Sequence, residues 1–168
     1  MRPFQARTTY DAPVAEVAAM MADPAFVERK VAASRPVSST VDVTTTPDGG
    51  FTVSTRRALP TSDLPAAAQR LVGATLELTL VERWGPAEAD GSRRGTVELD
   101  VVGKPASASG TATLAPGQPG QTVLVYEGTV EARIPLVGGK IEEQAVTQVQ
   151  RVLDGERRVG TAWLAERA

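Results

Sequence analysis

The spacing of apolar residues changes twice along the chain. After a loosely alternating segment at residues 3–10, apolar residues recur at helical intervals over residues 13–22. Asp11 precedes a proline at the start of this helical stretch, and the Asp23-Pro24 pair repeats the same signal, with the Asp23 side chain placed to cap a helix. We therefore expect one strand followed by two short helices, the second ending near residue 31.

The middle of the chain alternates with a period of two, as strands do. Turn-forming residues separate the alternating segments, most clearly at residues 47–50 and 116–120. Leu59-Pro60 interrupts one strand, and residues 65–72 favour one or two helical turns. The expected strands are residues 37–46, 51–56, 76–84, 97–101, 110–115 and 122–134.

The period returns to helical over residues 140–167, which predicts one long amphipathic helix. Gly155 and Gly160 each cost this helix about 1 kcal/mol relative to alanine. Its expected apolar arc comprises Ile141, Ala145, Val149, Val152, Leu153, Val159, Gly160, Trp163 and Leu164. This order of elements, with no repeat and no second core, predicts a single α+β domain over residues 1–168, in which an antiparallel sheet curves around the long helix.

Composition narrows the chemistry that the chain can perform. The 168 residues carry a formal charge of -2 and include neither cysteine nor histidine. Disulfides, Ser-His-Asp triads and Cys/His metal sites are therefore excluded, and we expect no metal and no cofactor. Charges of both signs are mixed along the chain, which argues against a nucleic-acid partner. No segment approaches about 18 apolar residues and the N-terminus lacks a signal segment, so we expect a cytoplasmic, soluble protein without an integral membrane segment.

Four segments carry a resemblance to a known family. They are YDAPVAEV at residues 10–17, DPAF at 23–26, VERW at 81–84 and IPLVGGKIE at 134–142. In this order they resemble the START-like superfamily, also called SRPBCC or Bet v 1-like, and more narrowly the DUF2505 family. The resemblance implies a helix-grip fold that holds a hydrophobic ligand between its curved sheet and its long C-terminal helix. Some superfamily members carry lipids, sterols or polyketide-derived molecules, whereas others are cyclases or hydroxylase subunits.

Strand parity and helix phase identify the side chains that can face such a ligand. Glu156 lies near the centre of the apolar arc, where a carboxylate must be paired, protonated or solvated. It is either a polar anchor for the ligand or half of an ion pair with an arginine from the sheet, and the ion pair is favoured. Gly160, one turn further on, either widens the cavity or allows close contact with the sheet.

Arg57, Glu82 and Tyr126 share the inward parity of their strands. Together with Glu156 they can orient a polar head group, whereas for each residue alone a solvated rim position or a satisfied core contact is favoured. The candidate cavity-lining residues are Arg57, Leu78, Leu80, Glu82, Leu99, Tyr126, Val149, Glu156 and Gly160.

Three functions are compatible with these patterns. The first is a carrier or sensor for a hydrophobic, lipid-like small molecule, because a core with only three Phe, two Trp and two Tyr favours leftover volume. The second is a polyketide cyclase or aromatase that uses the same cavity; the missing His and Cys weigh against an enzyme without excluding one. The third is an interaction module without a ligand, such as a homodimer paired along an exposed sheet edge.

Overall fold

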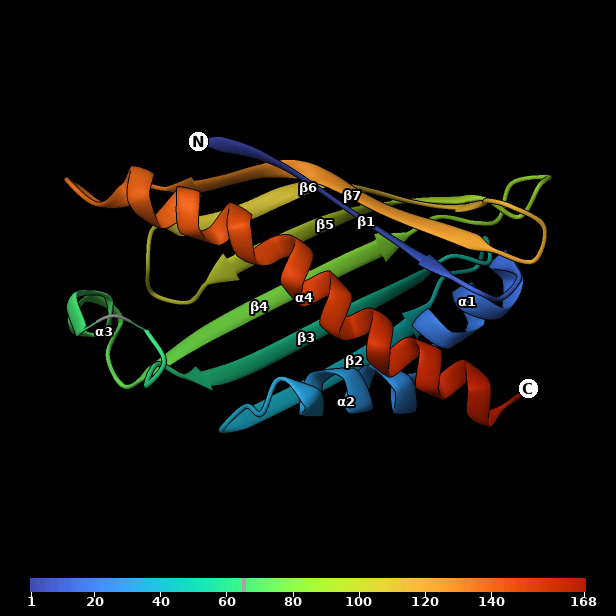
Figure 1. Ribbon diagram of the computed structural model, residues 1–168, viewed down its shortest axis with the longest axis horizontal. Coiled ribbons are helices and arrows are strands. Elements are labelled where there is room, and N and C mark those ends of the chain that lie inside the picture. The colour runs from blue at the N-terminus through green and yellow to red at the C-terminus, as the bar shows by residue number, and fades with distance from the viewer. Residues whose placement is uncertain (65) are drawn as a thin grey trace.

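A computed structural model describes residues 1–64 and 66–168 (Figure 1). The elements are β1 (Arg2–Tyr10), α1 (Val14–Met21), α2 (Pro24–Ala33), β2 (Ser38–Thr45), β3 (Phe51–Pro60), α3 (Ala66–Val72), β4 (Thr75–Trp84), β5 (Arg93–Val101), β6 (Ala106–Pro116), β7 (Thr122–Ala132) and α4 (Gly138–Glu166). This is the predicted order of strands and helices. Pro65, where the predicted helix of residues 65–72 begins, lies outside the described residues.

The seven strands form one antiparallel sheet in the order β1-β7-β6-β5-β4-β3-β2. The sheet curves, and α4 crosses its concave face diagonally (Figure 1). The helix packs mainly on β1 and β7, and its C-terminal half packs on α2. The predicted helix-grip architecture is therefore confirmed. None of the helices in the described residues is both long enough and apolar enough to cross a bilayer.

The first two helices start differently from one another. In α2, Asp23 caps the helix as predicted, because its Oδ1 accepts a hydrogen bond of 2.9 Å from the Ala25 backbone N–H. In α1 the residue before the first turn is Pro13, which offers no side-chain cap. The Asp11 carboxylate instead accepts a hydrogen bond of 2.9 Å from Gln121 Nε2, which joins the end of β1 to the start of β7.

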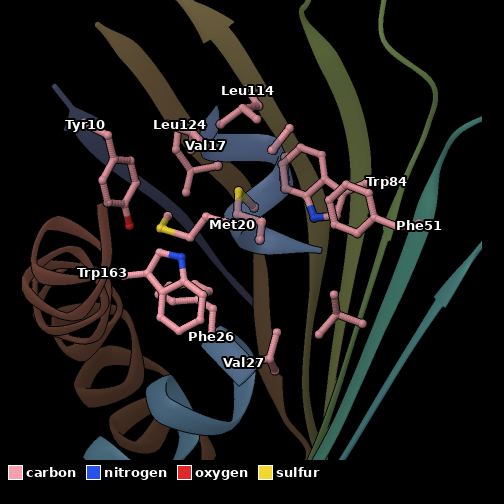
Figure 2. Close-up of a cluster of buried hydrophobic side chains, with 14 of the residues drawn as sticks. Tyr10, Val17, Met20, Phe26, Val27, Phe51, Trp84, Leu114, Leu124 and Trp163 are labelled. Carbon is pink, nitrogen blue, oxygen red and sulfur yellow. The ribbon is translucent and has the colours of Figure 1, made fainter. Parts of the chain in front are cut away.

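One end of the concave face is filled by a closed core (Figure 2). The ring of Phe26 meets the ring of Trp163 edge-on at 5.5 Å, and Phe51 stacks on Trp84 at 6.2 Å. The side chains labelled in this core are Tyr10, Val17, Met20, Phe26, Val27, Phe51, Trp84, Leu114, Leu124 and Trp163, all buried. They come from five of the strands and from α1, α2 and α4, so this end of the molecule holds the elements together.

The buried face of α4 is narrower than the predicted arc. Val152 was expected on the apolar side, but 58% of it is exposed. The inward stripe follows spacings of three and four residues through Val149, Leu153, Gly160 and Trp163. Val152 lies outside the face of α4 that packs on β1, β7 and α2, so the prediction for this residue is wrong.

Candidate functional site

Beyond the closed core, the concave face of the sheet carries apolar residues that solvent still reaches. The register places Thr55, Leu80 and Leu99 side by side on β3, β4 and β5, and Arg57 beside Leu78. We call the half-buried set on β4, β5 and β6 the concave apolar surface. It comprises Leu78, Leu80, Val97, Leu99, Val101 and Ala108. These side chains point to the same face of the sheet as the core residues, but they are only half-buried.

A polar cluster borders this apolar surface. Tyr126 Oη donates a hydrogen bond of 2.5 Å to Glu82 Oε1, and only 5% of Glu82 is exposed. The two residues lie on β7 and β4, with β5 and β6 between them in the sheet. The concave side of β6 carries only Gly110 and Ala112 at this level, so the tyrosine side chain has room to extend toward the carboxylate.

An ion pair between two helices completes one side of the cluster. Lys30 Nζ on α2 lies 3.6 Å from Glu156 Oε2 on α4, and both side chains are largely buried. Burial alone would lower the pKa of Lys30, but the negative charges of Glu156 and Glu82 outweigh it, so the pKa is raised. The ion pair predicted for Glu156 is thus present, but its partner is a lysine from α2 and not an arginine from the sheet.

Arg57 is the other cation of the cluster. Its Nη1 and Nη2 donate long hydrogen bonds to the hydroxyls of Ser34 (3.3 Å) and Thr55 (3.4 Å). Within the described residues, no carboxylate lies within 4.0 Å of its guanidinium. Burial lowers the pKa of Arg57, and the charges of Glu156 and Glu82 act against that effect. Among the described residues, the guanidinium has no hydrogen-bond acceptors other than these two hydroxyls, and the register places Arg57 beside Leu78.

The carboxylates of Glu82 and Glu156 also raise the pKa values of two tyrosines. Burial, followed by the charges of Glu82 and Glu156 and by the hydrogen bond to Glu82, raises the pKa of Tyr126 well above 10. Burial also raises the pKa of Tyr10, with contributions from Glu156 and Glu82. Both phenols are therefore proton donors at neutral pH and do not supply a base.

The remaining candidates on α4 have different surroundings. Val149 is half-buried in the inward stripe of the helix. Gly160 is buried, and a Cβ added to it would lie 2.7 Å from Tyr10 Cε1 and 3.1 Å from Met20 Cε. Of the two roles considered for Gly160, close packing against the sheet fits this geometry.

Lys30 was missed by the sequence analysis. A signal was present, because Lys30 follows Phe26 and Val27 by four and three residues and therefore lies on the buried side of α2. A lysine beside an apolar helix face is commonly solvated through its long side chain, so the pattern by itself did not distinguish it from a surface residue.

Comparison with known proteins agrees with this architecture. A family model with the description "Protein of unknown function (DUF2505)" matches residues 5–164. The chain belongs to the DUF2505 family. An uncharacterized protein of Mycobacterium tuberculosis is 28% identical to this DUF2505 chain over 97% of each sequence.

Two solved structures show how widely the fold is shared. A START superfamily protein from Mycobacterium smegmatis superposes on this DUF2505 chain with a TM-score of 0.55, at 11% identity and over 99% of each chain. Human STARD10 superposes with a TM-score of 0.63 at 8% identity, over 98% of this chain and 65% of its own. At such identities the likeness establishes the START-like fold, and the site must be argued from this chain's own residues.

Proposed function

We propose that the protein is a carrier or sensor that binds a hydrophobic, lipid-like small molecule between its sheet and α4. The observation that carries the proposal is the concave apolar surface, whose leucines and valines point inward and yet remain half-buried. Apolar side chains at inward positions are normally covered, so a guest that covers them gains hydrophobic stabilisation. The START-like fold supports this proposal, because members of the superfamily that this chain resembles hold ligands between the curved sheet and the long C-terminal helix.

The polar cluster would orient the bound molecule. Lys30 and Arg57 balance the two carboxylates of Glu82 and Glu156, so the cluster as a whole is neutral. A charged head group would disturb that balance, whereas a hydroxyl or carbonyl oxygen can accept a hydrogen bond from Arg57 at little electrostatic cost. We therefore expect the ligand to be an apolar molecule that carries a neutral, oxygen-containing group at one end.

Purified protein tests this proposal most directly. Native mass spectrometry after expression, and titration with apolar fluorescent probes, should reveal a bound small molecule. Ala108→Trp would fill the space above the concave apolar surface and should weaken probe binding about tenfold or more. Ser109→Trp is the matched control, because Ser109 is the next residue of β6, is exposed and points to the convex face. Probe binding equal in both variants would contradict a site on the concave face.

A second candidate is a cyclase-like enzyme that acts in the same place. The observation in its favour is that Tyr126 donates a hydrogen bond to Glu82, and that Glu82 and Glu156 lie close enough to influence the pKa values of both Arg57 and Tyr126. A phenol held protonated beside a carboxylate can act as a general acid toward a carbonyl oxygen. Incubation with a linear poly-β-ketone thioester would show protein-dependent cyclised products that decrease in Tyr126→Phe. Products that match the protein-free control would remove this candidate.

A further inference from the structure

The exposed large apolar side chains are unevenly distributed over the surface. They gather where β3 ends, β4 begins and α4 begins, at the left of Figure 1, and we call this the open end of the molecule. The exposed apolar residues at the open end are Met1, Val37, Leu64, Leu71, Val102 and Leu136. The opposite end, where β2 turns into β3 and β6 into β7, exposes no large apolar side chain among the described residues.

The topology explains why residues so distant in sequence meet at this end. Antiparallel pairing places four segments at the same end of the sheet. They are the start of β2, the β3–β4 connection, the β5–β6 turn and the β7–α4 turn. The concave apolar surface also lies on the side of the sheet nearest this end, whereas the closed core of Figure 2 lies beyond it. The apolar tips of the open end therefore come from four separate connections and from the N-terminus.

Leu136 is the most exposed and the most strained of these tips. Its relative exposure is 106%, and its backbone has a φ of 71°, a left-handed conformation that leucine rarely adopts. Glycine or asparagine would fit this position with less strain. Folding alone gives no reason for an apolar side chain that is both strained and fully solvated, which points to a role outside the fold.

Cations surround the apolar tips. Four exposed cations lie at this end: Arg35, Arg70, Lys104 and Lys140. None of them has a carboxylate within 4.0 Å among the described residues. Most carboxylates of this end are engaged: Glu77 with Arg56, Glu131 with Arg133, Glu142 with the Met1 ammonium and Glu143 with Arg2. Asp63 and Asp100 are the exceptions, so the unpaired charges of the open end sum to a positive value.

We propose that the open end docks on an anionic lipid bilayer. Separate apolar tips can each enter the interface between lipid head groups, while unpaired Lys and Arg side chains attract the negative surface. A protein partner would require a continuous, complementary contact area, which scattered tips on four connections do not offer. This docking goes beyond the proposed ligand binding and does not depend on it.

Vesicle flotation with the full chain tests the proposal. We expect binding to vesicles of phosphatidylcholine mixed with phosphatidylglycerol, weaker binding to phosphatidylcholine alone, and loss of binding as salt is raised. Leu71→Ser/Leu136→Asn should reduce the partition coefficient about tenfold or more, since two buried tips are lost. Because asparagine suits the left-handed backbone at position 136, this variant should stay folded, which circular dichroism verifies.

Matched controls separate docking from general effects of apolarity and charge. Val152→Ser removes an exposed apolar side chain from the outer face of α4, away from the open end, and should change vesicle binding less than twofold. Lys104→Glu/Lys140→Glu should abolish the preference for anionic vesicles, whereas Arg151→Glu, on α4, should preserve it. The proposal is overturned if no variant differs from its control, if no vesicle binding is detected, or if sedimentation shows that the open end pairs with a second copy.

Discussion

At the scale of single residues, the two tyrosines of the chain report on the polar cluster. Tyr10 and Tyr126 are the only tyrosines, and both have a pKa raised by burial and by the charges of Glu82 and Glu156. A phenol that holds its proton more tightly in the folded state than in the unfolded state contributes stability below pH about 10, and that contribution is lost as the pH rises further.

The resulting prediction concerns alkaline titration. The folded protein should show no tyrosinate absorbance as the pH passes about 10, whereas protein unfolded in guanidinium should titrate both phenols there. Tyr126→Phe should also make the free energy of unfolding fall less steeply above this pH than it does in the wild type. A native titration step near pH 10 would show that at least one tyrosine is not held as the structure has it.

At the scale of elements, α4 is fitted closely to the first strand. The Gln150 side chain accepts a hydrogen bond of 3.0 Å from the Arg7 backbone N–H and donates one of 3.0 Å to the Arg7 carbonyl. This amide satisfies backbone groups on the outer edge of β1, which would otherwise be open to pairing. Further along the helix, Gly160 lets Tyr10 and Met20 pack against the helix backbone.

Two glycines of α4 provide a matched test of this fit. Gly160→Ala should destabilise the protein by about 1–3 kcal/mol, because the added Cβ meets the Tyr10 ring. Gly155→Ala should stabilise it by about 0.5–1 kcal/mol, because its Cβ would meet only the Arg158 guanidinium, at 3.8 Å, and alanine favours helix. Urea denaturation measures both variants. Similar changes in the two would mean that Gly160 does not lie against β1.

At the scale of the whole molecule, packing is concentrated at one end. The closed core holds Phe26, Trp84 and Leu114 at 3% exposure or less, whereas the leucines and valines of the concave apolar surface are half-buried. A domain built in this way can be stable while one of its surfaces remains available to a guest, because cohesion and recognition are carried by different sets of side chains.

The same substitution at each end should therefore have different effects. Leu114→Ala should cost about 2–5 kcal/mol of unfolding free energy, as expected of a fully buried leucine. Leu99→Ala should cost about 1 kcal/mol, because solvent already reaches this side chain, and should weaken the binding of apolar probes. Paired denaturation and probe titrations give both quantities. A large loss of stability at Leu99 would show that the concave apolar surface is part of the core.

The sequence by itself determined the order of elements and the architecture. Hydrophobic periodicity depends only on the local repeat of a helix or strand, so the switch from period 3.6 to period 2 and back was visible without a structure. The same parity placed Arg57, Glu82 and Tyr126 on the inner face of the sheet, and the phase of α4 placed Glu156 on its inner side. These inferences needed no knowledge of which element lies next to which.

Only the tertiary structure decided which residues meet. That Glu156 pairs with Lys30, that Val152 is exposed and that Gly160 receives the Tyr10 ring all depend on where α4 lies relative to β1 and α2. The open end is likewise an outcome of strand pairing, because Leu64, Val102 and Leu136 are far apart in sequence. Periodicity assigns a side chain to a face, whereas its partners are determined by packing between elements, which no local pattern encodes.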